Sequence, residues 1–131
     1  PILMTEGLAN RLDGVTLKAG NPTILKVGGK PRNLLELSRD ELKPIRDKLL
    51  APLGLSFDAP NKVALYMVGH DCLVVENFND EPVDVSLKFR KQTTARPAVV
   101  LPADGTFEMR STDHKLSLAK TTARTLVALK Y

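Results

Sequence analysis

The chain contains 131 residues, of which 43% are hydrophobic and 26% are charged, a balance typical of a folded globular protein and unlike that of a disordered one. Its formal net charge is +4, and its lone cysteine excludes an intrachain disulfide. No apolar run approaches the roughly 20 residues of a membrane-spanning helix, and the first residues lack the basic start and apolar core of a signal peptide.

The first segment is expected to form one strand that enters one helix. Residues 1–4 are apolar, and Leu8 and Leu12 follow at helical spacing. Because a solitary strand needs a sheet to join, this segment is expected to be the tail of an α/β unit whose other strands precede residue 1, and the chain to be a piece of a longer protein. In an alternative interpretation of equal weight, the apolar start pairs with the short strands expected at residues 15–17 and 23–27.

A helix is predicted for residues 38–51. Ser38 and Glu41 form a capping-box pattern, in which each side chain can bond the backbone amide of the other residue. An apolar stripe at helical spacing consists of Leu42, Ile45 and Leu49. Pro44 lies beyond the first turn, so the helix is expected either to be kinked there or to begin near Lys43 after a short turn.

Residues 63–78 have the pattern of an antiparallel hairpin around which the rest of the chain is organised. Two apolar runs rich in β-branched residues flank a polar turn at residues 69–71. Both faces of the first run are apolar, so we expect it to be a central strand of its sheet. Residues 57–61 are expected to be the connector that leads into the hairpin.

Further short strands, separated by turns, are predicted downstream of the hairpin. In residues 83–89 apolar and polar residues alternate, which predicts a strand with one buried and one exposed face. The other strands are expected at residues 99–101, 107–109, 116–118 and 125–130. The pattern indicates an α+β protein, with a small α/β segment containing one main helix at residues 1–60 and an antiparallel β-sandwich of about seven strands at residues 61–131.

The two histidines, His70 and His114, each lie beside an aspartate in a predicted turn. If these turns met at one end of the sandwich, Asp71 and Asp113 would join the histidines as mixed nitrogen and oxygen ligands of a metal ion. Ordinary polar turns explain these residues equally well. The sequence therefore assigns no metal site.

No other pattern predicts a catalytic or cofactor-binding site. Glu76 is embedded in an apolar strand, where burial could raise its pKa, but it has no evident carboxylate partner for glycosidic chemistry. Cys72 is expected to be a small buried hydrophobe and not a nucleophile activated by His70. Residues 28–32 include two glycines, but a proline follows the lysine, so we expect a plain turn and not a phosphate-binding loop. We expect no cofactor and no self-contained catalytic site.

Basic residues cluster at one place in the chain, which raises nucleic acid as a possible partner. The cluster consists of Lys88, Arg90, Lys91 and Arg96. We interpret it as a solvated sheet face with its loop. Nucleic acid is therefore not the partner we favour, and no membrane partner is expected.

From residue 49 onward the sequence resembles the C-terminal portion of large bacterial glycoside hydrolases. The resemblance rests on LLAPLGLSFDAP, on VALYMVGHDCLVVENFNDEPVDVSLKF and on the closing RTLVALKY. In such enzymes a catalytic barrel is followed by a small antiparallel sandwich. The first dozen residues are similar to a strand and helix of the Rossmann-like or amidotransferase-like domains inserted in some of them. The resemblance implies a β-sandwich but no catalytic residue, because no position matches a catalytic motif of the family.

Two functions remain open for the chain. It is either a noncatalytic accessory domain of a carbohydrate-active enzyme, with a structural or packing role, or a free-standing binding module for a sugar or for an acidic partner such as nucleic acid. The absence of tryptophan favours the accessory domain, since sandwiches that bind sugars usually present exposed aromatic rings. The expected partner is the catalytic part of the parent protein or a second copy of the chain, at an exposed apolar surface. We expect that surface around Ile2, Leu3, Leu8, Leu12, Leu34, Leu35 and Leu37.

Overall fold

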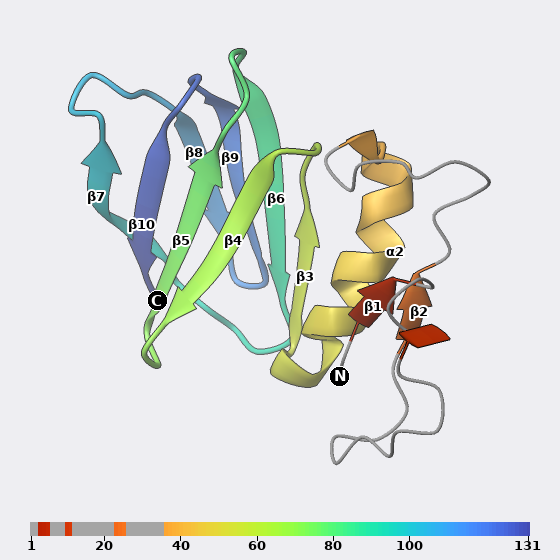
Figure 1. The fold of residues 1–131 in the computed structure, drawn as a ribbon. Coiled ribbons are helices and arrows are strands. Elements are labelled where there is room, and N and C mark those ends of the chain that lie inside the picture. Colours follow the sequence, from red (N-terminus) through yellow and green to blue (C-terminus); the bar gives the residue numbers. More distant parts are fainter. Residues whose placement is uncertain (1–2, 6–9, 12–22, 26–35) are drawn as a thin grey trace. The chain divides into compact units, whose positions relative to one another are not determined.

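The computed structural model, shown in Figure 1, describes residues 3–5, 10–11, 23–25 and 36–131. The chain divides into two compact units, of which the first is Pro1–Leu37 and the second is Ser38–Tyr131. Among the described residues, no helix is long and apolar enough to cross a membrane.

The first unit contains two short strands. Strand β1 (Leu3–Thr5) pairs in parallel with strand β2 (Thr23–Leu25). The apolar start of the chain therefore joins a later strand of the same chain, as one of the two interpretations predicted. Asn10 and Arg11, which lie within the helix predicted around Leu8 and Leu12, are helical, whereas the rest of that helix and the strand predicted at residues 15–17 lie outside the described residues.

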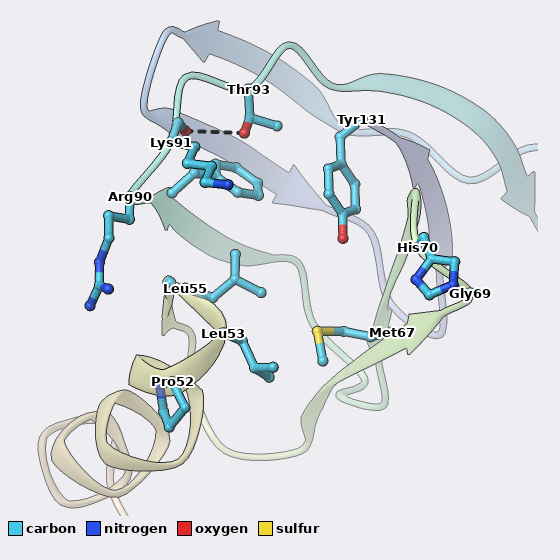
Figure 2. Close-up of a pocket in the computed structure, with 12 residues that line it drawn as sticks. Pro52, Leu53, Leu55, Met67, Gly69, His70, Arg90, Lys91, Thr93 and Tyr131 are labelled. Atoms are coloured by element: carbon cyan, nitrogen blue, oxygen red, sulfur yellow. Dashed lines mark hydrogen bonds between the residues drawn. The ribbon is translucent and has the colours of Figure 1, made fainter.

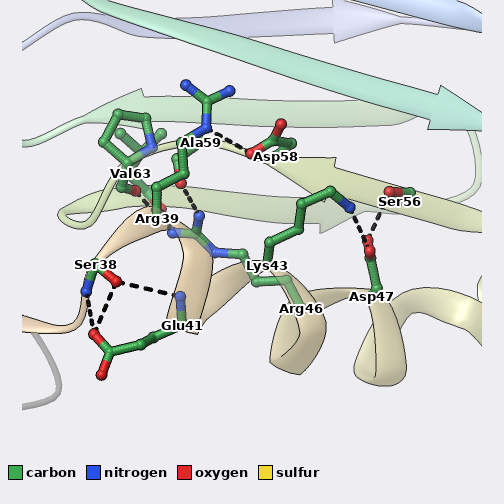
Figure 3. A network of polar contacts seen from close by, with 11 residues as sticks. Ser38, Arg39, Glu41, Lys43, Arg46, Asp47, Ser56, Asp58, Ala59 and Val63 are labelled. Carbon is green, nitrogen blue, oxygen red and sulfur yellow. Dashed lines mark hydrogen bonds and ion pairs between the residues drawn. The ribbon is translucent and has the colours of Figure 1, made fainter.

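The main helix, α2 (Arg39–Leu50), begins at a capping box. The Ser38 hydroxyl accepts a hydrogen bond from the Glu41 backbone amide (3.3 Å), and the Glu41 carboxylate accepts one from the Ser38 backbone amide (2.8 Å; Figure 3). Pro44 lies inside the helix, so the helix does not begin at Lys43. The predicted helix is thus confirmed.

The second unit continues with a short 3-10 helix and eight strands. The 3-10 helix, η2 (Ala51–Leu53), ends at Gly54, whose left-handed backbone (φ of 70°) suits a residue without a side chain. The strands are β3 (Leu55–Asp58), β4 (Val63–Val68), β5 (Cys72–Asn77), β6 (Val83–Phe89), β7 (Arg96–Leu101), β8 (Glu108–Thr112), β9 (Lys115–Thr121) and β10 (Leu126–Lys130). They form two antiparallel sheets of four strands, in the orders β4-β5-β10-β7 and β3-β6-β9-β8 (Figure 1).

Side chains from both sheets form one hydrophobic core between them. The core residues are Leu55, Phe57, Ala59, Val63, Leu73, Val75, Val85, Leu87, Phe89, Ala95, Leu116, Leu118, Val127 and Leu129. In β6, Val85 and Leu87 are buried whereas Asp84 and Lys88 are exposed, which confirms the predicted alternation. The structure therefore confirms a largely antiparallel β-sandwich, with eight strands where about seven were predicted.

Two expectations about individual strands are wrong. The connector expected at residues 57–61 overlaps strand β3, in which Phe57 pairs with Leu87 of β6. The first strand of the hairpin, β4, is an edge strand of its sheet and not a central strand. Its last three residues are apolar and yet exposed. The prediction failed because a strand with an exposed apolar outer face has apolar residues at every position, as does a strand that is buried on both faces.

Arg46 attaches α2 to the connection between β3 and β4 (Figure 3). Its guanidinium donates hydrogen bonds to the backbone carbonyls of Ala59, Pro60 (3.0 Å) and Val63 (3.1 Å). It also lies over the Phe57 ring, 4.7 Å from the ring centre. Burial lowers the pKa of Arg46. The helix therefore belongs to the same compact unit as the sandwich, while the domain boundary expected at residue 60 stays a prediction.

The ion pair between Arg39 and Asp58 should make part of the folding free energy depend on pH. The Arg39 Nε atom donates to Asp58 Oδ1 (2.6 Å), and this hydrogen bond lowers the pKa of Asp58. Because the folded-state pKa is the lower one, the ion pair stabilises the fold above the unfolded-state pKa of about 4, and this stabilisation is lost as the pH falls through the folded-state pKa. We expect Asp58→Asn to reduce the free energy of unfolding at neutral pH and to have a smaller effect toward about pH 3, measured by urea denaturation.

Asp104→Asn is the control for this measurement, because Asp104 is exposed in the turn before β8. It should leave the free energy of unfolding nearly unchanged at both pH values. If Asp58→Asn lowered the free energy of unfolding by the same amount at every pH, the proposed role of the ion pair would be wrong.

Candidate functional site: an apolar sheet face and a groove at the end of the sandwich

The outer face of the β4-β5-β10-β7 sheet is largely apolar, and the charged residues that strand pairing places on it are Glu76, Lys130 and Arg96. Successive side chains of a strand point to opposite faces, so residues that pair across strands lie on the same face. Leu73 and Val75 of β5 are buried in the core, and the residues between them point outward. The outward-facing apolar residues, which we call the apolar sheet face, are Ala64, Tyr66 and Val68 of β4, Cys72 and Val74 of β5, Leu126 and Ala128 of β10, and Val99 and Leu101 of β7.

Four large side chains of the apolar sheet face are strongly exposed. Their exposed fractions are 45% for Tyr66, 54% for Val68, 48% for Val99 and 54% for Leu101. Glu76 lies on the same face, and desolvation together with this carboxylate raises the pKa of Tyr66. Soluble monomers seldom leave large contiguous apolar patches open to water, so this face has the character of a packing surface.

The outer face of the opposite sheet is polar. Ser86 pairs with Ser117 of β9, and Ser117 pairs with Arg110 of β8. In the same sheet, Lys120 forms an ion pair with Glu108 (2.6 Å). The two outer faces of the sandwich therefore differ in chemistry, and the β3-β6-β9-β8 face has the composition of a solvated surface.

A groove of about 490 Å³ opens at the end of the sandwich that carries the β4–β5 turn (Figure 2). We call it the end groove. Its apolar lining consists of Pro52, Leu53, Leu55, Met67, Phe89 and Tyr131. The exposed fractions are 55% for Leu53, 42% for Met67 and 41% for Tyr131. The Tyr131 ring lies 6.0 Å from the Phe89 ring, and its hydroxyl points into the groove (Figure 2).

Basic side chains border the end groove. Arg90 and Lys91 follow strand β6, and His70 lies in the β4–β5 turn. The Arg90 backbone amide donates to the Gly54 carbonyl (2.8 Å), which joins the start of β3 to the end of β6. In the described part of the chain no aspartate or glutamate lines the groove, and neither Arg90 nor Lys91 forms an ion pair. The groove therefore combines an apolar floor with uncompensated positive charge.

The structure does not gather the candidate metal ligands into a cluster. His70 lines the end groove, and the Asp71 carboxylate lies 3.8 Å from the Lys130 ammonium. Asp113 and His114 form the turn between β8 and β9. Within residues 36–131 and the shorter described ranges, no group of three or more His, Cys, Asp and Glu side chains could hold a metal ion.

The remaining residues singled out in the sequence lie at or near the surface. Cys72 is half-buried on the apolar sheet face, so the expectation of a core cysteine is wrong. Of the basic cluster, Arg90 and Lys91 line the end groove, whereas Lys88 lies exposed on the outer face of β6 and Arg96 is the first residue of β7. The glycine-containing loop at residues 28–32 lies outside the described residues.

The structure does not describe most of the side chains that were expected to form a packing surface in the first unit. Leu37 is described, and it is buried, so it does not contribute to an exposed surface. The undescribed side chains of that expected surface are those of Ile2, Leu3, Leu8, Leu12, Leu34 and Leu35. The apolar sheet face was not foreseen, although the two-sided apolar pattern of residues 63–68 was its signal in the sequence.

Comparison with known proteins identifies a family for most of the second unit. A family model described as "Probable glycosyl hydrolase, C-terminal domain" matches residues 54–129. This range extends from the end of η2 almost to the end of β10, and it includes all nine residues of the apolar sheet face. No curated protein and no solved structure matches the chain.

Proposed function

Because the chain belongs to the family of probable glycosyl hydrolase C-terminal domains, we propose that it is a noncatalytic accessory domain that packs against the catalytic part of its parent enzyme. The family description, which names a C-terminal domain of a probable hydrolase, supports this proposal, because a C-terminal domain follows the other parts of its protein. Domains of one polypeptide commonly pack through interfaces that remove apolar surface from water. The observation that carries the proposal is the apolar sheet face.

The apolar sheet face extends across the full width of its sheet. Its most exposed side chains come from both edge strands, Tyr66 and Val68 from β4 and Val99 and Leu101 from β7. Burial of apolar surface stabilises an interface by roughly 25 cal/mol per Å², without any requirement for matched charges. Packing against the rest of the enzyme would remove the largest exposed aliphatic side chains of this sheet from water.

The distribution of acids on the apolar sheet face and in the end groove supports a noncatalytic role. Glycosidic hydrolysis requires two carboxyl groups on either side of the scissile bond, about 5 to 10 Å apart. In the described strands, Glu76 is the one acid on the outer face of the β4-β5-β10-β7 sheet. Among the described residues, no acid lines the end groove. Neither surface therefore offers the carboxylate pair that the reaction needs.

We expect Val99→Lys to uncouple the domain from its parent enzyme. Val99 lies on the apolar sheet face in edge strand β7, so a lysine there would place a charge in the proposed interface and leave the core of the domain unchanged. In calorimetry of the parent enzyme, the substituted domain should unfold in a separate transition at a lower temperature. In the isolated chain, light scattering should show self-association at micromolar concentration, which the substitution reduces.

Thr112→Lys is the matched control, because Thr112 is also β-branched and lies exposed on edge strand β8 of the other sheet. It should leave the calorimetric profile of the parent enzyme and the self-association of the chain unchanged. Equal effects of the two substitutions would show that the apolar sheet face is not the interface. Hydrolysis of an aryl glycoside by the isolated chain at an enzymatic rate would contradict the noncatalytic role.

A further inference from the structure

The end groove is a second surface with the features of a binding site. It is lined by residues of η2, β4, β6 and the C-terminal end, which meet at one end of the sandwich (Figure 2). We propose that it binds an extended peptide segment of the parent enzyme in which an aliphatic side chain lies next to an aspartate or glutamate. This inference rests on the proposed accessory role and names a second contact through which the domain recognises its parent.

The floor of the groove suits an aliphatic side chain. Leu53 and Met67 are exposed there although both are large and apolar, and the Tyr131 ring faces the same space (Figure 2). The groove volume of about 490 Å³ lies within the range of natural ligand pockets. The thioether of Met67 is flexible and polarisable, so it can adapt to the shape of an inserted side chain. An aliphatic group bound here would remove all three exposed side chains from water.

The border of the groove suits a carboxylate. Lys91 extends over the groove in Figure 2, and it has no ion pair among the described residues. Asp71 is the acid next to the groove residue His70 in the sequence, but its carboxylate lies 3.8 Å from Lys130. A carboxylate of the bound segment would therefore be the charge complement that no described aspartate or glutamate side chain provides in the groove.

In a second hollow, of about 460 Å³, by contrast, side chains of opposite charge lie together. It is lined by Arg39 and Lys62 together with Asp80, Glu81 and Asp84. Arg39 is paired with Asp58, and Asp80 is paired with Arg124, at 2.6 Å in both cases. That hollow has charges of both signs, so it does not select an anionic ligand as the end groove does.

The lining favours a peptide over an acidic sugar. Sugar sites usually present exposed aromatic rings for stacking, whereas Tyr131 is the one exposed ring here and it is tilted by 39° against Phe89. The other exposed apolar groups, Pro52, Leu53 and Met67, are not aromatic. An acidic oligosaccharide is therefore the competing occupant that the experiment has to distinguish.

The test is an NMR titration of the ¹⁵N-labelled 131-residue protein with two short peptides. The first is acetylated and amidated Ala-Leu-Glu-Leu-Ala, and the second has glutamine in place of glutamate. Both should shift the backbone amide signals of Gly69, His70, Lys91 and Thr93. The acidic peptide should bind about fivefold more tightly, the factor expected for one partly exposed ion pair.

Lys91→Glu should reverse the preference between the two peptides. Lys88→Glu is the control, because it changes the net charge by the same amount on the exposed outer face of β6, where Lys88 does not line the groove, and it should keep the preference. Absence of shifts at the groove amides, equal affinity of the peptides, or groove shifts produced by trigalacturonate but not by the peptides would overturn the proposal. These amides report on the end groove alone, whereas Val99→Lys reports on the apolar sheet face, so failure of one proposal is distinguishable from failure of the other.

Discussion

Replacing Val85 by aspartate is expected to destabilise the sandwich by about 4 kcal/mol or more, a large part of the stability of a typical small domain. Val85 is 3% exposed and lies opposite Leu118 in the β6–β9 pair. The introduced carboxylate would be buried between the two sheets, with apolar side chains around it and no cation to pair with it. Thermal unfolding followed by circular dichroism should show a melting temperature lowered by many degrees, or no folded protein at all.

Lys88→Asp introduces the same side chain in the same strand on the exposed face. Lys88 lies opposite Lys115 of β9, so an aspartate there would replace a like-charge pair by an opposite-charge pair. The free energy of unfolding should therefore change by no more than about 0.5 kcal/mol. If Val85→Asp and Lys88→Asp had equal melting temperatures, the face of β6 that carries Val85 would not be the buried one.

Asn77 is a buried polar residue that joins the two sheets. It is 0% exposed at the end of β5, and its side-chain amide donates to the carbonyls of Glu81 (3.0 Å), Thr121 (3.1 Å) and Thr122 (3.0 Å). Its side-chain oxygen accepts hydrogen bonds from the backbone (2.9 Å) and side-chain (3.0 Å) nitrogens of Asn79. One side chain thus provides hydrogen-bond partners for backbone groups at the end of β9 and in the turn that leads into β6.

Asn77→Asp should lower the free energy of unfolding by about 3 kcal/mol or more at neutral pH. The substitution keeps the shape of the side chain but replaces the donor group by a carboxylate oxygen, which would face three carbonyl oxygens with no hydrogen to share. Burial and repulsion would raise the pKa of the introduced carboxyl group, so the deficit should grow as the pH rises above about 4 and shrink below it. Urea denaturation across this pH range measures the effect.

Gln92→Glu is the matched control for this prediction, because it makes the same amide-to-carboxylate change at an exposed position. It should leave the free energy of unfolding nearly unchanged at every pH. If Asn77→Asp unfolded at the same urea concentration as the control, the hydrogen bonds of Asn77 would not hold the sheets together as the structure indicates.

The elements predicted correctly are those that short stretches of sequence specify. The capping box of Ser38 and Glu41 identifies the start of α2 because its hydrogen bonds join residues three apart. The hairpin of β4 and β5 follows from two apolar runs around a polar turn, and its register pairs Val63 with Asn77 and Val68 with Cys72. The alternation in β6 identifies its buried face for the same local reason.

The elements missed are those whose role depends on distant neighbours. The short strand β3 is stabilised by pairing with β6, which lies about 30 residues later, and by α2, whose Asp47 accepts a hydrogen bond from Ser56 and whose Arg46 lies over the Phe57 ring. The edge position of β4 depends on which strands lie beside β5, namely β4 and β10. The role of Asn77 depends on carbonyls at Thr121 and Thr122, which no local pattern around NFNDEP reveals.

By itself the sequence determined the helix, the hairpin, the alternating strand β6 and the resemblance to the C-terminal portion of a glycoside hydrolase, because these rest on spacings within a few turns or strands. In strands with apolar residues on both faces, only the tertiary structure decided which of these residues are buried and which are exposed. Val75 and Val74 are neighbours of the same type in β5, yet Val75 lies in the core and Val74 on the apolar sheet face. The end groove likewise exists because η2, β4, β6 and Tyr131 meet at one end of the sandwich. Such surfaces depend on how the sheets stack, which is set by contacts between residues far apart in the chain.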